Sequence, residues 1–466
     1  MTDRPAINKI PATIVRGVLH GVLDADESAM LLKHNRGYRV LRIGLALSRV
    51  LPRYWLLTIR GLLGRPASQR AWDRAHEAAA EQMRQLAIAL EGGLIKAAQI
   101  FGSRADVLPR PFIDKLSQFH DDVPPRPFDT LAPVIEAELG APIDTIFASV
   151  ERQPLGAASL AQVHRARLHD GSDVVIKIQY PEARRVIPLD LAMLRRVAGL
   201  VQHLQSILDF RSMANEITHF IELELDFRRE AQSTQRLAQL LSQRTDVRVP
   251  RIDERYTSNR VIVMEFLDGI QVTRTQALRA AGHKLSEVGR RIGDIYGAML
   301  FEYGFFHGDP HPGNLLVLRD GRIGLLDFGL CKELPAHFAN QVAQMMVAAL
   351  IGDSAAALEA AAALSFDIEE IRPEHLRSLM LAVIGDSDVD NLASVLGATR
   401  IRHIPSDFAL VLRTMLLLNG LSHRLAPGRR LVQGELIKHL AAGAANGSGH
   451  HRPMAQVQRP GASGSS

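Results

Sequence analysis

Short apolar runs alternate with turn residues in the middle of the chain and predict β-strands. Residues 174–179 are mostly β-branched and follow Asp170 and Gly171, a pair that favours a hairpin turn. Residues 247–252 and 261–266 have the same apolar character and predict two later strands. We therefore expect a small antiparallel sheet in this part of the chain.

Further along, three apolar runs enclose two polar segments. The runs cover residues 299–306, 315–318 and 323–326. The sequence HGDPHPGN occupies positions 307–314, and DFG follows the third run at 327–329. This spacing places the polar residues at the ends of predicted elements, where functional side chains are commonly found.

An Asp, an Asn five places later and a second Asp that opens an Asp-Phe-Gly turn form the phosphate and metal half of a kinase site. In this interpretation Asp309 orients the attacking hydroxyl or water, while Asn314 and Asp327 hold Mg²⁺. The alternative is a polar hairpin turn that matches the motif by chance.

A kinase also needs a strand lysine that contacts the α- and β-phosphates. Lys177 lies at the centre of the run 174–179 and precedes Asp309 in the chain, which is the order that kinases have. The alternative is a solvated lysine on an exposed strand face. We predict that Lys177 is catalytic.

The loop expected to cover the phosphates is rich in alanine instead of glycine. It spans residues 155–164, and the backbone of Ala157, Ala158 and Ser159 is predicted to contact the nucleotide. Alanine disfavours positive φ, so this loop is expected to be stiffer than a glycine loop. Residues 264–267 predict a hinge, where Glu265 and Leu267 would offer backbone groups to adenine.

Several motifs together resemble one family, the UbiB/AarF-type atypical kinases of the coenzyme Q biosynthesis group. They are AASLAQVHRA at residues 157–166, KAAQ at 96–99 and ELD at 224–226, with Glu230 shortly after. The resemblance covers about residues 85–425. Two alanines, Ala98 and Ala161, stand where this family usually has glycine.

The resemblance implies an added element that guards the nucleotide site. Lys96 and Gln99 would belong to this element, and Glu224 and Asp226 to its partner helix. Residues 222–240 contain neither Gly nor Pro and predict one continuous helix. At about 100° per residue, Glu224 and Glu230 would point about 120° apart.

This one helix could therefore supply a carboxylate partner to each of two lysines. Glu230 would face Lys177, as the glutamate of a kinase helix does, and Glu224 would face Lys96. In the family that second lysine enters the space where a protein substrate would bind. The alternative is that these acids form a solvated helix face.

Histidines and the single cysteine suggest no further chemistry. His307 and His311 flank Asp309 with a spacing that also occurs in zinc sites, but we expect His307 to brace the backbone and His164 to be structural. Cys331 is the only cysteine, so no intrachain disulfide is possible and a reducing cytoplasm fits.

Composition narrows the class of protein. Lys and Arg number 55 against 50 Asp and Glu, a net charge of +5, and neither a zinc-finger spacing nor an RNA-binding aromatic signature accompanies it, so no nucleic-acid partner is expected. The first residues do not resemble a signal peptide and no run of 18 apolar residues occurs. We expect a cytoplasmic protein without a transmembrane segment.

One segment could touch a membrane from outside. Residues 39–65 mix arginines, aromatic residues and leucines in a pattern that is similar to an interfacial amphipathic helix, which we expect to be broken near Pro52. The alternative is an ordinary helix packed on the kinase part with a solvated arginine face. Peripheral contact with a membrane or lipid, and contact with quinone-biosynthesis proteins, follow as expectations about partners.

The predicted fold is α+β, a two-lobed protein-kinase-like fold with an added N-terminal helical element. The expected boundaries are a helical extension at 1–85, the guard element and linker at 86–127, a small lobe at 128–268, a large lobe at 269–440 and a disordered tail at 441–466. We expect adenine nucleotide, ATP or ADP, with Mg²⁺ between the lobes.

The predicted function is an atypical kinase or ATPase that supports isoprenoid-quinone or lipid metabolism, a role that the family resemblance implies. Two alternatives stay open. One is a nucleotide-sensing pseudokinase that acts through partners. The other is a small-molecule phosphotransferase of the aminoglycoside or choline kinase type, whose sites are similar around Asp309, Asn314 and Asp327.

Overall fold

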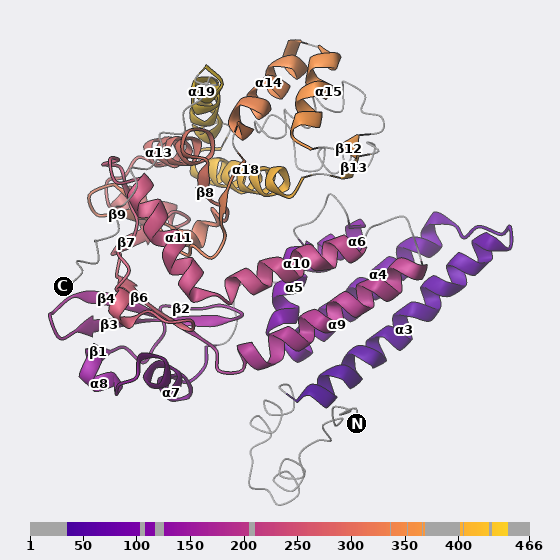
Figure 1. Ribbon diagram of the computed structural model, residues 1–466, viewed down its shortest axis with the longest axis horizontal. Coiled ribbons are helices and arrows are strands. Elements are labelled where there is room, and N and C mark those ends of the chain that lie inside the picture. The colour runs from indigo at the N-terminus through magenta and orange to yellow at the C-terminus, as the bar shows by residue number, and fades with distance from the viewer. Residues whose placement is uncertain are drawn as a thin grey trace, which may run out of the picture. The chain divides into compact units, whose positions relative to one another are not determined.

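The chain divides into two compact units. Unit 1 comprises Met1–Ser233 and Arg251–Phe266, and unit 2 comprises Thr234–Pro250 and Leu267–Ser466 (Figure 1). This computed structural model describes residues 35–102, 108–116, 125–204, 210–335, 337–351, 353–365, 367–368, 401–403, 405–427 and 431–445.

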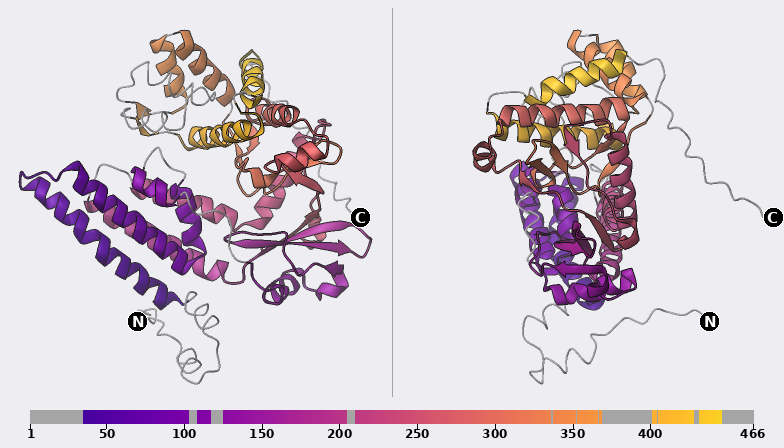
Figure 2. Two further views of the ribbon diagram at one scale, coloured as in Figure 1. Left: turned by 180° about the vertical axis from the view of Figure 1, so that it is seen from behind. Right: turned by 90° about the vertical axis from the view of Figure 1, so that its left-hand side faces the viewer.

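Unit 1 begins with two long helices that run side by side, α3 (Arg36–Leu62) and α4 (Gln69–Leu90) (Figures 1 and 2). The side chain of Asn35 caps α3 by accepting a hydrogen bond from the Tyr38 amide at 3.2 Å. Glu91 and Gly92 both have positive φ (54° and 60°), and the chain turns there into the next helix.

Four further helices complete the helical part of unit 1. They are α5 (Gly93–Gly102), α6 (Arg110–Leu116), α9 (Ala183–Leu204) and α10 (Phe210–Glu224). Helix α5 contacts α4, α6, α9 and α10. Its small buried residues Ala97 and Ala98 permit that close packing.

A buried ion pair fastens α3 to α9. Arg39 is 1% exposed and donates to both carboxylate oxygens of Asp190 at 2.8 and 2.5 Å, and a third donation goes to the Leu90 carbonyl at 2.6 Å. Burial raises the pKa of Asp190 to about 6, while Arg39 acts in the opposite direction. The pair fixes which face of α3 packs inward.

The sheet of unit 1 is antiparallel with the order β1-β3-β4-β6, and β2 pairs with β3. The strands are β1 (Phe147–Val150), β2 (Gly156–Ala157), β3 (Ala161–Leu168), β4 (Asp173–Gln179) and β6 (Val261–Glu265). The hairpin predicted at Asp170 and Gly171 joins β3 to β4, and Gly171 has a φ of 87°.

The two faces of this sheet are covered differently. Ile176 and Ile178 lie in the core that includes residues of α7 (Phe128–Leu139), which contacts β4 and β6; the short helix α8 (Ile143–Ile146) follows. On the opposite face Phe227 packs with Ile262 and Met264. Alternation along β4 puts Lys177 on this second face.

The single helix predicted for residues 222–240 is in fact two helices. Helix α10 ends at Glu224, and α11 (Phe227–Leu240) begins after the two intervening residues Leu225 and Asp226. The side chain of Asp226 accepts the Arg229 amide at 3.1 Å, which is the hydrogen bond of a helix N-cap. The angle calculated between Glu224 and Glu230 was therefore wrong, because the helix does not run through.

Unit 2 contains a second sheet with the order β5-β10-β9-β7. Its strands are β5 (Val247–Arg248), β10 (Ile323–Leu325), β9 (Leu315–Leu318) and β7 (Gly269–Gln271), and β5 runs parallel to β10. The strand predicted at 247–252 is thus divided, because Ile252 bridges Met264 in unit 1. A short pair, β8 (Phe305–His307) and β11 (Cys331–Glu333), lies beside the polar segments.

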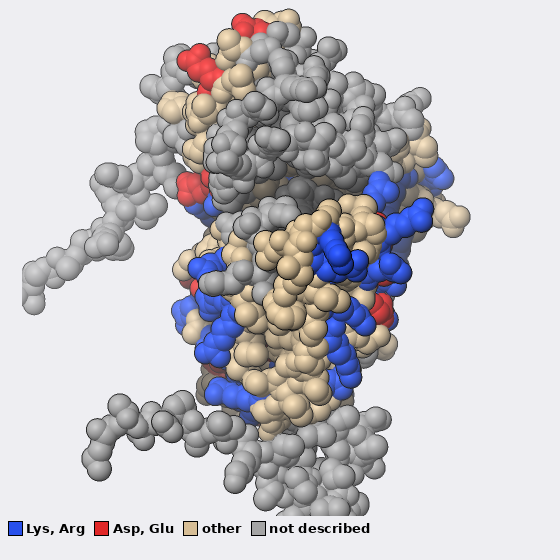
Figure 3. All heavy atoms as spheres, turned by 90° about the vertical axis from the view of Figure 1, so that its right-hand side faces the viewer, with Lys and Arg blue, Asp and Glu red and all other residues tan. Residues whose placement is uncertain are grey.

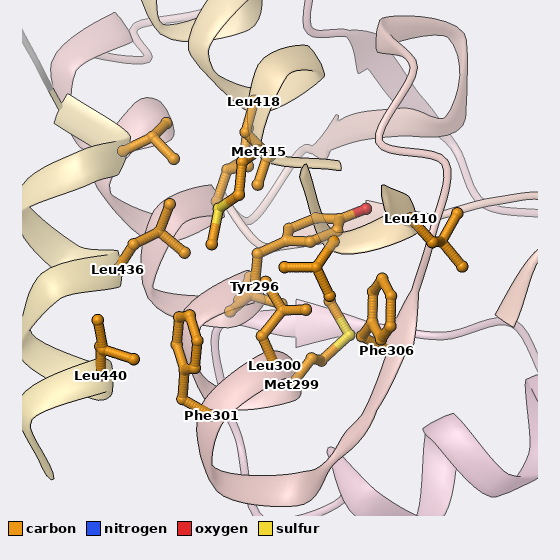
Figure 4. Close-up of a cluster of buried hydrophobic side chains, with 14 of the residues drawn as sticks. Tyr296, Met299, Leu300, Phe301, Phe306, Leu410, Met415, Leu418, Leu436 and Leu440 are labelled. Carbon is orange, nitrogen blue, oxygen red and sulfur yellow. The ribbon is translucent and has the colours of Figure 1, made fainter. Parts of the chain in front are cut away.

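Helices form the rest of unit 2. They are α12 (Thr275–Ala280), α13 (Leu285–Gly297) continued by a π-helix (Ala298–Tyr303), α14 (Phe338–Ile351), α15 (Ser354–Ala363), α18 (Ser406–Leu425) and α19 (Leu431–Ala445). A two-stranded pair, β12 (Asp367–Ile368) and β13 (Ile401–His403), accompanies them. Figure 4 shows Tyr296, Met299 and Phe306 in one core with Met415 of α18 and Leu436 of α19.

The expected domain boundaries and the observed units differ in two places. Residues 234–250, predicted in the small lobe, belong to unit 2, and the described residues up to 127 belong to unit 1 together with the sheet. Helix α19 continues to Ala445, into the predicted tail at 441–466, and residues 446–466 lie outside the described part.

Candidate functional site

Unit 1 holds the predicted lysine and its acid in direct contact. Lys177 sits mid-strand between Val163 of β3 and Ile262 of β6, and its Nζ donates to Oε1 of Glu230 at 2.6 Å. The Glu230 side chain is 3% exposed, and that of Lys177 is 14% exposed. The ammonium also lies 5.4 Å from the centroid of the Phe227 ring.

The β4–α11 geometry explains this contact. Asp226 starts α11 where it does, so Glu230 comes one turn into the helix, on the side of Phe227 that packs on the sheet. A carboxylate this deeply buried needs a cation, and Lys177 supplies it. The structure therefore brings together two residues that lie 53 positions apart in the sequence.

A second ion pair joins the predicted guard element to α10. The Lys96 Nζ of α5 lies 2.7 Å from Glu224 Oε1, and both side chains are about a quarter exposed. Gln99 lies half-buried one turn later on α5. Asp226 is exposed and caps α11, where its side chain accepts the Arg229 backbone amide.

The alanine-rich loop is a tight hairpin between β2 and β3. Ala157 pairs with Gln162, and the Ala158 amide donates to the Ala161 carbonyl at 2.8 Å. Ser159 is buried. This corrects one expectation, because the Ala158 amide is already used within the hairpin and is not offered to a phosphate.

None of the four alanines discussed for this region has a positive φ: Ala98, Ala157, Ala158 and Ala161. Ala98 lies within α5 and is fully buried, and Ala161 opens β3. Replacing the family's glycine by alanine is therefore compatible with the local backbone at both positions.

Behind this hairpin lies a buried polar network that sequence analysis did not foresee in full. The His164 Nδ1 donates to the Glu151 carbonyl at 2.8 Å, and its Nε2 accepts from Gln162 at 2.9 Å. Burial lowers the pKa of His164, which agrees with a neutral ring. Gln162 also bonds the amide and carbonyl of Arg126 at 2.8 and 3.0 Å. His164 is structural, as predicted.

Two backbone amides of the predicted hinge already donate hydrogen bonds within the protein. The Glu265 amide donates to the Arg251 carbonyl at 2.8 Å, and the Phe266 amide donates to Asp173 at 3.1 Å. Leu267 packs with Leu316 in unit 2. The amide of Glu265 is thus bonded within unit 1. The chain crosses from unit 1 to unit 2 between Phe266 and Leu267.

Unit 2 brings Asp309 and Asn314 together. The Asn314 Nδ2 donates to the Asp309 carbonyl at 3.1 Å and to its Oδ2 at 3.3 Å. A third residue, Arg413 of α18, donates to Asp309 Oδ1 at 3.0 Å. Sequence analysis missed Arg413, since it lies 104 positions away and no local motif marks it.

His307 connects the segment of Asp309 to that of Asp327. The ring is fully buried; its Nε2 donates to the carbonyls of Leu326 and Asp327 at 3.0 and 2.7 Å, and its Nδ1 accepts from the Tyr296 hydroxyl at 2.9 Å. Burial raises the pKa of Tyr296 well above its usual value, so its hydroxyl keeps the proton it donates. His307 braces the backbone, as predicted.

Asp327 adopts an unusual backbone conformation. Its φ is 58°, in the left-handed region that costs energy for a residue with a side chain. The His307 bond to its carbonyl helps to hold this conformation, and its exposed side chain accepts the Gly329 amide at 3.4 Å. Such strain is typical of functional positions.

Gly308 permits a close approach beside Asp309. Its amide donates to the Leu330 carbonyl at 2.7 Å, and a Cβ at this position would lie 2.8 Å from the same oxygen. His311 lies in a turn and accepts the Gly313 amide at 3.2 Å. Within the part of the chain that the structure describes, no three His, Cys, Asp or Glu side chains are grouped as metal ligands.

The donor chemistry in unit 2 suits Mg²⁺ bound together with a nucleotide. Mg²⁺ prefers oxygen ligands and keeps few protein side chains when phosphates complete its shell. Asp327 offers a carboxylate, and Asn314, whose Nδ2 bonds Asp309, has its amide oxygen for a cation. Among the described residues no group of three His, Cys, Asp or Glu is found, and Asp327 with Asn314 would suit a metal whose remaining ligands come from phosphate.

Comparison with known proteins agrees with this geometry. The model of the ABC1 atypical kinase-like domain matches residues 118–361. The chain belongs to this family. The predicted UbiB/AarF-type membership is thereby confirmed, and the Lys96 element precedes the matched residues.

Several curated relatives carry the names of kinases. AarF domain-containing kinase 1 of Drosophila melanogaster is 35% identical over 282 residues, which are 60% of this chain and 54% of the relative. A chloroplastic ACTIVITY OF BC1 COMPLEX KINASE 7 of Arabidopsis thaliana is 30% identical over 368 residues, 75% of this chain and 52% of the relative. The chain spans about half the length of these two relatives.

A solved structure shows the same fold. Rv3197 of Mycobacterium tuberculosis, in a complex with erythromycin, matches with a TM-score of 0.53 and 22% identity, covering 77% of this chain and 95% of that one. The predicted α+β kinase-like fold with preceding helices is confirmed. No helix among the described residues is long and apolar enough to cross a membrane.

Proposed function

We propose that this protein is an atypical kinase or ATPase that binds a Mg-adenine nucleotide and transfers its terminal phosphoryl group to water or to an acceptor. The observation that carries the proposal is the Lys177–Glu230 pair at 2.6 Å. A strand lysine held by a helix glutamate is the arrangement with which kinases contact the α- and β-phosphates.

The residues of unit 2 support the same chemistry. Asp309 would orient the attacking hydroxyl or water, and Asn314 and Arg413 hold its carboxylate in place. Asp327 and Asn314 would carry the metal, which supplies charge neutralisation on the phosphates. Since phosphoryl transfer depends mainly on positioning and electrostatics, these few groups suffice for the reaction.

The physiological role proposed here rests on the family alone. Members of the UbiB/AarF group are associated with coenzyme Q biosynthesis, so support of isoprenoid-quinone or lipid metabolism is the proposed setting. A phosphate acceptor, and partners among quinone-biosynthesis proteins, belong to the same proposal.

A pseudokinase is the second candidate, and one observation favours it. The Ala158 amide bonds within its own hairpin and is not offered to a phosphate. This feature would reduce turnover without preventing nucleotide binding. A nucleotide-dependent change in the protein would then be the output.

Single-turnover kinetics with ATP labelled at the γ-phosphate distinguish the two candidates. We expect labelled phosphate to be released, or transferred to the protein, by the wild type with Mg²⁺ and not by Asp309→Asn. Arg319→Gln, a change of an exposed residue in unit 2, serves as a control and should react like the wild type. Nucleotide binding without any release by the wild type would support the pseudokinase instead.

A further inference from the structure

Helix α3 presents a row of large apolar side chains to solvent. Its inward face is formed by Arg39, Ile43 and Leu57. The outward residues keep from 45% to 82% of their surface exposed: Leu41 59%, Leu45 45%, Trp55 56%, Leu56 56% and Leu62 82%. We call these five residues the outer stripe.

The outer stripe has two parts on one helix face, Leu41 with Leu45 and Trp55 with Leu56 and Leu62, and the exposed residues Ser48 and Pro52 lie between them. At about 100° per residue, all five side chains fall within an arc of about 120° around the helix axis. Arg39, Ile43 and Leu57 point about 160° away from Leu41, on the opposite side. A helix of 27 residues is about 40 Å long, so the stripe is long as well as narrow.

Positive charge lines one border of the outer stripe. Arg42, Arg49, Arg53 and Arg60 all lie between about 80° and 120° from Leu41 around the helix. The helix contains no Asp or Glu. In Figure 3, uncharged surface on this side is bordered by Lys and Arg side chains, with few Asp and Glu among them.

The helix cannot turn this stripe inward without breaking its own anchors. The Arg39–Asp190 pair fixes one end of α3. Towards the other end, the Tyr54 hydroxyl bonds His76 of α4 at 2.7 Å, and Trp72 packs against both rings. The exposed position of the outer stripe is therefore a built feature of unit 1.

We propose that the outer stripe of α3 docks the protein on the surface of an anionic lipid bilayer. Leucines and a tryptophan along one face, with arginines at the border and no acids, suit the boundary between headgroups and acyl chains. Arginines attract anionic headgroups, and Trp55 has the amphipathic ring that favours this interface. The inference does not depend on the nucleotide chemistry proposed above.

Co-sedimentation of the full chain with vesicles tests the proposal. We expect binding to phosphatidylcholine vesicles that contain phosphatidylglycerol, and much weaker binding to phosphatidylcholine alone. Trp55→Ser with Leu56→Ser should lower the vesicle affinity by about tenfold or more, because two large apolar side chains leave the interface. Val347→Ser with Leu358→Ser, which changes exposed apolar residues of unit 2, should bind like the wild type.

The charge contribution needs its own variant. Arg49→Gln, Arg53→Gln and Arg60→Gln combined should remove most of the preference for anionic vesicles and its sensitivity to salt. The matched control changes three exposed arginines elsewhere, Arg152, Arg251 and Arg319, and should keep the preference. Equal binding by both triple variants would overturn the electrostatic part and with it the proposal.

Trp55 also reports its own position. The chain has two tryptophans, so Trp72→Phe leaves Trp55 as the single emitter. We expect its emission to shift to the blue and to become protected from an aqueous quencher when anionic vesicles are added. No shift, no vesicle binding by the full chain, or concentration-dependent self-association that the stripe variant abolishes would each overturn lipid docking.

Discussion

At the scale of single residues, the carboxylate of Asp309 accepts hydrogen bonds from two side chains in different parts of unit 2. Asn314 comes from the same short segment, whereas Arg413 comes from α18. The motif spacing predicted the first contact because its residues are five apart. The second depends on how α18 packs, which no local pattern encodes.

Arg413 is expected to position Asp309. Both side chains of the pair are about one-third exposed, so Arg413→Ala should change the free energy of unfolding by only about 1 kcal/mol or less. We expect kcat for phosphate release to fall by about tenfold in Arg413→Ala, with KM for ATP nearly unchanged, because the lost contact orients Asp309 for the chemical step and does not bind the nucleotide. Arg413→Lys should restore part of the rate, and a KM change equal to the kcat change would contradict this role.

Lys177 and Glu230 should behave as one unit. Removing Lys177 takes away the ammonium that contacts the buried Glu230 carboxylate, which is expected to cost about 3 kcal/mol of stability. A double-mutant cycle with Lys177→Ala and Glu230→Ala should give a coupling of about 1–3 kcal/mol in nucleotide binding. The exposed pair Lys438 and Glu435 is the control and should show almost none. Additive losses at the first pair would mean that it has no part in binding.

At the scale of elements, correct contacts were predicted from an incorrect helix. The pairs Lys177–Glu230 and Lys96–Glu224 both form, but through two helices separated at Leu225 and Asp226. The absence of Gly and Pro favoured a continuous helix, although Asp226 is a residue type that commonly caps a helix N-terminus. Asp226 was assigned to the guard site, whereas its hydrogen bond to the Arg229 amide is explained by helix capping.

Asp226 should therefore matter through its cap. Asp226→Ala should lower the free energy of unfolding by about 1 kcal/mol, and Asp226→Asn should lose much less because the amide oxygen still accepts the Arg229 amide. Thermal unfolding of the two variants measures this. Asp353, which caps α15 in the same way, gives a matched comparison. If Asn is as harmful as Ala, the negative charge and not the cap is what the site needs.

The Arg39–Asp190 pair should control how firmly α3 is attached. Asp190→Ala removes the carboxylate that pairs with the buried Arg39 and is expected to cost about 3–5 kcal/mol. The double change Arg39→Met with Asp190→Leu should cost clearly less, because no charge remains buried. Chemical denaturation of the three proteins gives the numbers. A double variant less stable than the single one would show that the ion pair itself stabilises the helix.

At the scale of the whole molecule, sequence reasoning found the fold but not all of its boundaries. The motifs span most of the chain, and their order matched a kinase-like fold that the family model and a solved structure support. Residues 234–250 were placed in the wrong unit because β5 pairs in parallel with β10, some 75 residues later, and such pairing leaves no local signal.

Nucleotide binding is the property on which the whole account rests, and Asp327 is the residue that tests it. Asp327 of unit 2 has a strained backbone that a hydrogen bond from His307 helps to hold, and such strain is typical of functional positions. Asp327→Asn should therefore keep the fold and lose the metal-dependent part of binding.

Calorimetric titration of the full chain with ADP, with and without Mg²⁺, is the most direct test. We predict Mg²⁺-dependent binding by the wild type, at least about tenfold weaker binding by Asp327→Asn, and unchanged binding by Asp320→Asn, whose carboxylate bonds only its own turn in the contacts seen here. An Asp327→Asn protein that is folded and binds Mg-ADP with the affinity of the wild type would contradict the kinase-type site.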